Sequence, residues 1–342
     1  MQRPLSISEF LQDSVQKPVF DVRSPAEFEK GHIPGASNIP LFTNEERALV
    51  GTKYKNAGKD PAVLLGLEIV GPKLADFVRQ AKALAPGKKV LVHCWRGGMR
   101  SSSFAWLLNT AGFEATTLHQ GYKAYRRHVL RSFENRYQLL VLGGETGSGK
   151  TDILAQIAAR GEQVIDLEAL AHHRGSSFGA LGQHPQPGVE VFENIFSHQL
   201  LLLDPSRRIW LEDESKSIGR VFIPDAFWMQ MKTAPLIRVN VPKAARVARL
   251  VKEYGQFPKA DLEAAVLRIQ KRIGGLAYKQ CIEALALGEL ATVADITLDY
   301  YDKAYNFNKE KNVVDSVVME ADLPELAAEK VIGLANAQRR NE

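Results

Sequence analysis

Short apolar segments alternate with amphipathic ones along the first third of the chain. Residues 18–23 and 88–93 are apolar runs of strand length, and each ends in a polar residue. The Ser-Pro pair at 24–25 is typical of a helix start, and residues 101–111 repeat apolar side chains at helical spacing. This alternation of strand and helix signals predicts an α/β domain over residues 1–131.

The rest of the chain shows the same alternation and then becomes mainly helical. An apolar run at 136–143 leads through a glycine-rich turn into a helix predicted over 152–159. Three further apolar segments have strand length: 162–166, 208–212 and 235–241. Strands that alternate with helices favour a parallel sheet with ligands at its carboxyl edge. We therefore expect a second domain over 132–342, a parallel-sheet domain with a helical C-terminal part.

Composition places the chain among globular proteins. Of its 342 residues 45% are hydrophobic, and 44 Lys and Arg against 39 Asp and Glu give a formal net charge of +5. That surplus permits nucleic-acid binding without requiring it. The first residues lack the apolar core of a secretion signal, and no apolar run approaches the roughly 20 residues that cross a bilayer. We expect a cytoplasmic protein with no membrane association.

Cys94 and Cys281 are the only cysteines, so a disulfide framework or a zinc site is not expected. Cys281 belongs to a helical segment and is expected in the core. Cys94 instead lies between a predicted strand and a helix start, where backbone N–H groups converge and stabilise a thiolate. Glycines let such a loop curl into an anion-binding nest, and arginines add positive charge. The candidate cradle residues are Arg96, Gly97, Gly98 and Arg100.

Residues 144–151, with the sequence GETGSGKT, fill every position of a P-loop, or Walker A, motif. The motif follows a predicted strand and opens a predicted helix, which is the context it requires. Backbone N–H groups of the glycines wrap phosphate oxygens, the lysine adds a charge, and the threonine hydroxyl binds phosphate or Mg²⁺. The candidate phosphate-binding residues are Gly144, Gly147, Gly149, Lys150 and Thr151. The second domain is thus expected to be P-loop NTPase-like.

Two further segments admit more than one interpretation. Residues 212–214, Glu-Asp-Glu, end a predicted strand and are either a solvated acidic turn or a Walker B site, with Mg²⁺ held by Thr151 and Asp213. The polar loop 172–179 is either a connector or a substrate loop with His173, Arg174 and Ser176 as its candidates.

Basic residues are frequent in two stretches. Residues 126–136 contain four arginines, which are expected to bridge the domains or to touch nucleic acid. Residues 243–279 favour a solvated helix face, with a track for RNA phosphates or a lid over the P-loop ligand as the alternatives. The basic residues of this second stretch are Lys243, Arg246, Arg249, Lys252, Arg268, Lys271, Arg272 and Lys279.

The segments 20–28 and 31–40, FDVRSPAEF and GHIPGASNIP, resemble the rhodanese family. This resemblance implies an α/β sulfurtransferase fold in which Cys94 carries a chalcogen atom as a persulfide-like adduct. Asp21, Arg23 and the 31–40 stretch would then be mainly scaffold. The spacing Cys94-x5-Arg100 is one residue longer than in common rhodanese loops and equals that of cysteine-dependent phosphatases. A longer loop makes a wider cradle, for a phosphate-like group or for an atom larger than sulfur.

A rhodanese-like domain followed by a P-loop domain resembles the bacterial tRNA 2-selenouridine synthase family, and residues 173–179 and 214–219 add to the likeness. The resemblance implies a selenotransferase and geranyltransferase acting on tRNA. Its target is 2-thiouridine at the wobble position of the anticodon loop. Selenium from selenophosphate replaces the sulfur, through S-geranyl-2-thiouridine formed from geranyl diphosphate. The P-loop would hold the diphosphate, and ATP hydrolysis would not be required.

Two other function classes remain open. The chain is alternatively a P-loop kinase fused to a sulfurtransferase or phosphatase-like domain that acts on a small metabolite. It is also consistent with a nucleotide-gated binding protein whose first domain is a docking module. The intact Cys94 loop weighs against the docking module, and the basic helices weigh against the metabolite kinase.

Overall fold

The structure, a computed structural model, describes residues 3–307 and 312–338 and forms two compact units. Unit 1 comprises Met1–Ser132 together with Glu193–His198, and unit 2 comprises Phe133–Phe192 and Gln199–Glu342. Sequence analysis assigned residues 193–198 to the second domain. In the structure they are the middle of helix α10 (Val189–Leu202) and belong to unit 1.

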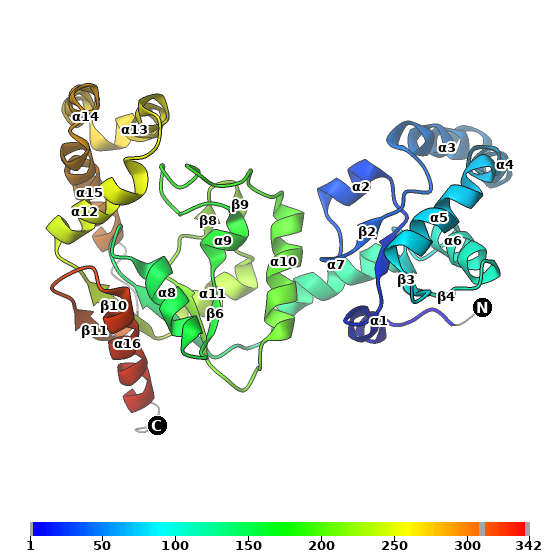
Figure 1. Ribbon diagram of the computed structural model, residues 1–342, viewed down its shortest axis with the longest axis horizontal. Coiled ribbons are helices and arrows are strands. Elements are labelled where there is room, and N and C mark those ends of the chain that lie inside the picture. The colour runs from blue at the N-terminus through cyan, green and yellow to red at the C-terminus, as the bar shows by residue number, and fades with distance from the viewer. Residues whose placement is uncertain (1–2, 308–311, 339–342) are drawn as a thin grey trace. The chain divides into compact units, whose positions relative to one another are not determined.

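Unit 1 is built around a parallel sheet with the strand order β2-β1-β3-β4 (Figure 1). The strands are β1 (Val19–Asp21), β2 (Ser37–Asn38), β3 (Lys89–His93) and β4 (Glu114–Thr117). The helices are α1 (Ile7–Ser14), α2 (Pro25–Lys30), α3 (Asn44–Ala57), α4 (Lys59–Val70), α5 (Leu74–Leu84), α6 (Met99–Thr110) and α7 (Gly121–Ser132), with a 3₁₀ turn η1 (Gly71–Lys73). The expected strands at 18–23 and 88–93 and the expected helices are confirmed, with ends shifted by one to two residues.

Alternation along β3 separates the two faces of this sheet. Val90 and Val92 join the buried cluster formed with α5 and α6, which includes Phe77 and Phe104. Leu91, also fully buried, points to the opposite face because successive strand residues alternate. Burial on both faces is typical of a parallel sheet covered by helices. The sheet thereby fixes the position of the residue that follows β3, which is Cys94.

Unit 2 contains a second parallel sheet, with the strand order β11-β10-β5-β7-β6. The strands are β5 (Leu139–Gly143), β6 (Gln163–Ile165), β7 (Ile209–Glu212), β10 (Leu236–Asn240) and β11 (Val313–Val318), and β8 (Ser217–Ile218) pairs with β9 (Val221–Phe222). The helices are α8 (Lys150–Ala159), α9 (Leu167–Ala171), α11 (Asp225–Thr233), α12 (Lys243–Tyr254), α13 (Lys259–Ile273), α14 (Gly275–Leu287), α15 (Leu290–Phe307) and α16 (Pro324–Gln338). The predicted strands and the helix after the P-loop are confirmed.

Helices α8 and α16 lie side by side over one face of this sheet (Figure 1). Their apolar residues form a common core with Leu140, Leu142 and Trp210 of the central strands. The P-loop spans the short gap between β5 and α8, at the carboxyl ends of the strands. Cys281 is fully buried among α13, α14 and α15, as predicted.

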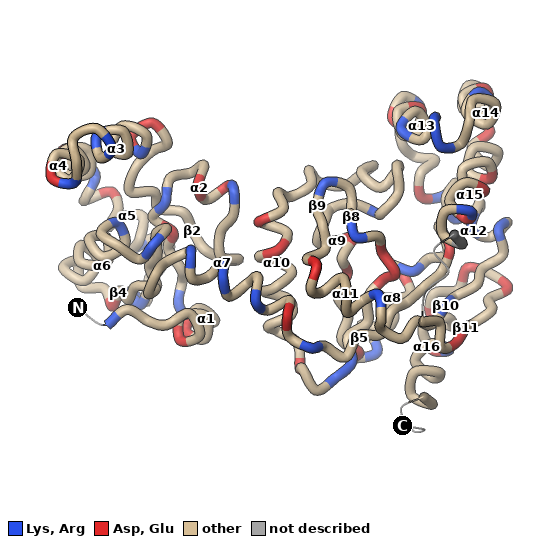
Figure 2. The backbone as a smooth tube through the Cα atoms, turned by 180° about the vertical axis from the view of Figure 1, so that it is seen from behind, with Lys and Arg blue, Asp and Glu red and all other residues tan. Residues whose placement is uncertain are grey.

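Basic and acidic residues are interspersed along α12 to α15 (Figure 2). Arg246 is buried and pairs with Asp302, while Lys243 pairs with Asp299 and Arg249 with Asp322. Each of these partners neutralises a charge that sequence analysis had left free for RNA or for a ligand. Among the described residues, no helix is both long and apolar enough to cross a membrane.

Candidate functional site

Cys94 follows directly after β3 and precedes the first residue of α6 by five positions. Cys94 is 3% exposed, and its Sγ lies 3.2 Å from the Oγ of Ser101. The carbonyl oxygen of Gly98 lies 4.0 Å from the same sulfur. The loop therefore buries the thiol and surrounds it with polar groups of its own residues.

The loop is fastened by backbone hydrogen bonds to the start of α7. The N–H of Tyr122 donates to the carbonyl of Cys94 at 2.8 Å, and that of Lys123 to the carbonyl of Trp95 at 3.0 Å. Gly97 has φ +64°, and a Cβ there would lie 2.5 Å from the carbonyl oxygen of Leu118. Backbone packs directly on backbone here, so glycine is required and the loop is held in one conformation.

The two arginines of the predicted cradle occupy different environments. Arg100 is partly buried and donates a 2.9 Å hydrogen bond to Oε2 of Glu27, in the first turn of α2. Burial alone would raise the pKa of Glu27, but the bond from Arg100 holds it below its ordinary value. Arg96 is exposed. The guanidinium of Arg100 is thus bound by a carboxylate from another helix. No sequence motif had indicated this contact.

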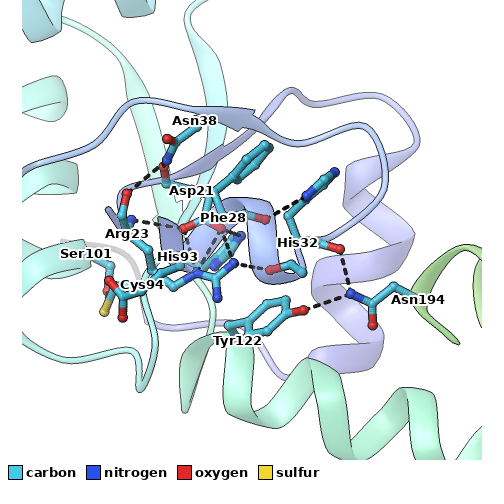
Figure 3. Close-up of polar contacts among 12 residues, drawn as sticks. Asp21, Arg23, Phe28, His32, Asn38, His93, Cys94, Ser101, Tyr122 and Asn194 are labelled. Carbon is cyan, nitrogen blue, oxygen red and sulfur yellow. Dashed lines mark hydrogen bonds and ion pairs between the residues drawn. The ribbon is translucent and has the colours of Figure 1, made fainter. Parts of the chain in front are cut away.

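A buried polar cluster supports the Cys94 loop (Figure 3). Arg23 donates hydrogen bonds to both carboxylate oxygens of Asp21, at 3.0 Å to Oδ1 and at 2.6 and 2.9 Å to Oδ2. Its guanidinium lies 3.8 Å from the ring centroid of Tyr122. Asn194 of α10 donates to the hydroxyl of Tyr122 at 2.8 Å. Burial lowers the pKa of His93, although the carboxylate of Asp21 acts in the opposite direction. Asp21 and Arg23 are 0% and 1% exposed, as expected of scaffold residues.

In unit 2 the P-loop encloses the ammonium group of Lys150. Its Nζ donates to the carbonyl of Gly144 at 3.0 Å and lies 3.4 Å from Oε1 of Glu212. Burial alone would lower the pKa of Lys150, but the carboxylates, Glu212 above all, raise it. Gly147 and Gly149 both have φ +77°, a conformation that leaves the backbone N–H groups of the loop free of Cβ atoms.

Three glutamates gather beside Thr151, and we call Glu168, Glu212 and Glu214 the glutamate cluster. Their carboxylate oxygens lie within 4.8 Å of one another. Burial and the neighbouring carboxylates raise the pKa to about 8 for Glu168 and Glu212 and to about 7 for Glu214. The Thr151 hydroxyl donates to Oε2 of Glu168 at 3.2 Å. The solvated-turn interpretation is wrong for Glu212, which is only 4% exposed.

Asp213, the acid that sequence analysis paired with Thr151, lines the same cavity but is not part of the glutamate cluster. Its Oδ2 accepts a 2.9 Å hydrogen bond from the hydroxyl of Tyr305 on α15. Side chains alternate along an extended strand, so the residue after Glu212 points away from the cluster. The same Tyr305 oxygen accepts the N–H of Gly144 at 2.9 Å. Tyr305 and Asp213 therefore fix the first glycine of the P-loop.

The 173–179 loop lies over the glutamate cluster. A Cβ on Gly175 would lie 2.8 Å from Oε1 of Glu214 and 3.0 Å from Oε1 of Glu168. The hydroxyl of Tyr301 binds Ser177 at its N–H (3.0 Å) and its Oγ (2.7 Å). Of the predicted residues, Arg174 and Ser176 line the cavity described next. Burial lowers the pKa of His173. The loop is therefore part of the P-loop site.

A cavity of about 900 Å³ joins the P-loop, the glutamate cluster and the 173–179 loop. Its lining includes the P-loop residues predicted to bind phosphate: Gly144, Gly147, Gly149, Lys150 and Thr151. Its lining also includes apolar and aromatic residues, among them Phe178, Trp228, Met231, Tyr254, Leu262 and Leu285. The cavity therefore suits a ligand that combines a phosphate group with an apolar group.

Comparison with known proteins identifies the family. Residues 6–128 match the model of the rhodanese-like domain, and residues 137–330 match that of the tRNA 2-selenouridine synthase AAA domain. The chain belongs to the tRNA 2-selenouridine synthase family. The expected fold, a rhodanese-like domain followed by a P-loop domain with C-terminal helices, is confirmed.

Several relatives are named tRNA 2-selenouridine synthase. The one from Sulfurovum sp. (strain NBC37-1) is 36% identical over 86% of this chain and 89% of its own. That from Bdellovibrio bacteriovorus is 34% identical over 91% and 93%, and that from Shewanella loihica is 35% identical over 89% and 90%. The likeness thus covers both units.

Sequence reasoning missed several residues of these sites. Glu168 lies 44 positions before Glu212, and only the pairing of β6 with β7 brings them together. The sequence did offer one signal for Glu168: it is an acidic residue just after the predicted strand 162–166, at the sheet edge where the P-loop lies. Tyr301 and Tyr305 lie on a helix far along the chain and carried no signal in the sequence.

Proposed function

We propose that the chain is a tRNA-modifying enzyme that replaces the sulfur of wobble 2-thiouridine with selenium, through an S-geranyl-2-thiouridine intermediate. The names of its relatives support the tRNA substrate and the selenium product. The cavity is the observation that supports the geranylated intermediate, because its lining combines the P-loop with apolar residues. An allylic diphosphate such as geranyl diphosphate has this distribution of charge and hydrocarbon.

The P-loop suits the chemistry of an allylic diphosphate. As the allylic C–O bond breaks, negative charge accumulates on the departing diphosphate. Lys150 and the backbone N–H groups of the loop stabilise that charge in a largely buried site. The apolar residues of the lining hold the hydrocarbon and keep water from the electrophilic carbon. Alkylation turns the sulfur of the base into a neutral thiol leaving group, and no nucleotide is hydrolysed.

The glutamate cluster fits a magnesium ion bound together with the diphosphate. Its oxygen donors are those that Mg²⁺ prefers, and Oε2 of the buried Glu212 has no hydrogen-bond partner among the described residues. Glu168 and Glu214 supply further oxygens, and Thr151 supplies a hydroxyl. A magnesium ion held by these residues would supply positive charge beside the diphosphate. Asp213 is not required for this site, because it is engaged by Tyr305.

The Cys94 loop is proposed to act on selenophosphate, with Cys94 as the sulfur nucleophile. The loop offers an anion nest at the start of α6, next to a buried thiol. Arg96, Gly97, Gly98 and Arg100 form the cradle in this proposal. Its length, one residue more than in common rhodanese loops, accommodates a larger anion.

The tRNA is proposed to contact basic side chains that remain exposed on the C-terminal helices. Phosphate contacts need lysines and arginines reachable from solvent. Lys252, Lys271, Arg272 and Lys279 are exposed, unlike the buried Arg246. These exposed residues support a phosphate track better than those held in ion pairs with α15.

Mass spectrometry of tRNA nucleosides tests the proposed function directly. Purified full-length protein is incubated with 2-thiouridine tRNA and geranyl diphosphate, and then with selenophosphate. We expect S-geranyl-2-thiouridine first and 2-selenouridine second, without ATP. Stoichiometric ATP turnover in the absence of tRNA, with no change in the nucleosides, would instead identify a metabolite kinase.

A further inference from the structure

Arg249 of α12 lies directly against the P-loop. A Cβ on Gly149, the residue that precedes α8, would lie 2.9 Å from Nη1 of Arg249 and 3.1 Å from its Cζ. Both residues line the cavity. The guanidinium therefore lies beside the loop backbone at the start of α8, where a bound phosphate is expected.

Three carboxylates surround this guanidinium, and they differ in exposure. Nη1 donates to Asp322, in the turn between β11 and α16, at 2.6 and 2.7 Å, and Nε lies 2.9 Å from Oε1 of Glu253. Nη2 pairs with Asp152, in the first turn of α8. The side chain of Asp152 is 59% exposed, against 33% and 29% for the other two acids. Asp152 is therefore the partner most easily exchanged, because ion pairs of exposed residues contribute little.

Arg246, one turn earlier on α12, uses its donors differently. It donates to the carbonyl of Thr146 at 3.1 Å and to both carboxylate oxygens of Asp302 on α15. Arg246 thus fastens the P-loop to α15. Arg249 instead directs its three nitrogens to carboxylates. A phosphate can take the place of a carboxylate at a guanidinium, because the planar fork of arginine binds both anions in the same geometry.

We propose that Arg249 is a diphosphate-binding residue, and that a phosphate oxygen of the substrate takes the place of Asp152 at Nη2. The inference rests on the proposed function, in which the P-loop holds an allylic diphosphate. Asp322 and Glu253 keep the guanidinium in place, while Asp152 moves into solvent as the anion enters. The site then presents two cations, Lys150 and Arg249, to a ligand that carries more than one negative charge.

Asp152 thereby acts as an internal competitor of the diphosphate. Without a ligand it pairs with a guanidinium that is always charged and whose side chain is only 9% exposed. Removal of the negative charge of Asp152 should therefore strengthen anion binding, and removal of the positive charge of Arg249 should weaken it. An ion pair that only stabilises the fold predicts no such opposite effects.

Isothermal titration calorimetry of the full-length protein with inorganic pyrophosphate, at fixed Mg²⁺ and salt concentrations, tests the proposal. In Arg249→Gln we expect at least about tenfold weaker binding, from the loss of one hydrogen bond between charged groups. The matched control Arg160→Gln removes an exposed positive charge at the other end of α8 and should bind like the wild type. Equal affinities of Arg249→Gln and the wild type would overturn the proposal.

Asp152→Asn keeps the test valid if Arg249→Gln unfolds. We expect about threefold tighter pyrophosphate binding, the equivalent of one exposed ion pair that no longer competes. Glu283→Gln, which removes an acid from an exposed ion pair on α14, is its control and should leave the affinity unchanged. Unchanged or weaker binding in Asp152→Asn would show that the pair serves the fold alone and would refute the exchange.

Lys150→Ala separates this inference from the proposed function. If Lys150→Ala lost pyrophosphate binding while Arg249→Gln bound normally, the role of Arg249 alone would be excluded. If the wild type bound no pyrophosphate, the diphosphate site itself would be excluded, and the inference with it.

Discussion

Arg23 and Asp21 illustrate how single residues hold the Cys94 loop. The two side chains are almost fully buried, so removing one leaves the other charged and without solvent. We expect Arg23→Ala to lower the free energy of unfolding by about 3–5 kcal/mol, measured by urea denaturation. Arg79→Ala, which removes an exposed ion pair with Asp76, serves as the control and should have a far smaller effect. Equal losses in the two variants would contradict the scaffold role.

The glutamate cluster makes stability depend on pH. In the folded state the pKa of Glu212 is about 8, against an ordinary value of 4.5, so the folded protein retains protons that the unfolded chain releases. The free energy of unfolding should therefore fall as pH rises from about 5 to about 8, when diphosphate and metals are absent. Glu212→Gln should flatten this slope, while Glu283→Gln, at an exposed ion pair, should not. A wild-type stability that rises over this range would refute the argument.

Residues within one contiguous motif could be predicted from the sequence, and residues brought in by the fold could not. Cys94 and Lys150 were identified because their loops carry all their glycines within a few positions. Glu27, Glu168 and Tyr305 reach the same sites from separate elements. Their roles depend on strand order and on helix packing, which one sequence does not specify.

Helix α15 links two loops of the P-loop site through tyrosines one turn apart. Tyr301 binds the 173–179 loop, and Tyr305 binds Gly144 and Asp213. Tyr305→Phe removes the hydroxyl that fixes the first glycine of the P-loop. We expect about fivefold weaker binding of inorganic pyrophosphate by calorimetry, the equivalent of one ordinary hydrogen bond. Tyr300→Phe, on the same helix with its hydroxyl near Arg272, should bind normally. An unchanged affinity in Tyr305→Phe would exclude this positioning role.

Elements were predicted well where the hydrophobic period was clear. The strands at 88–93 and 136–143 and the helix after the P-loop fall within a few residues of their predicted bounds. The strand β11 lies in a part expected to be helical and completes the edge of the second sheet. Its residues are largely exposed and gave little periodic signal. The basic stretch at 243–279 could not be interpreted because many of its acidic partners, such as Glu145, Asp302 and Asp322, lie far away in the sequence.

At the scale of the whole molecule, the chain carries two sites of different chemistry on two units. The P-loop site contains a cavity lined by polar and apolar residues, and the Cys94 loop contains a buried thiol. We propose one step for each site: alkylation of the base sulfur in unit 2 and delivery of selenium in unit 1. Variants in one site should therefore leave the other step intact.

The most direct measurement follows the two steps separately in two variants, by mass spectrometry of the tRNA nucleosides. Lys150→Ala should fail to geranylate 2-thiouridine tRNA, yet convert tRNA that already carries S-geranyl-2-thiouridine when selenophosphate is supplied. Cys94→Ala should do the reverse, geranylating normally and accumulating the S-geranyl nucleoside. If Cys94→Ala formed 2-selenouridine at the wild-type rate, or Lys150→Ala geranylated at that rate, the division of steps between the two sites would be contradicted.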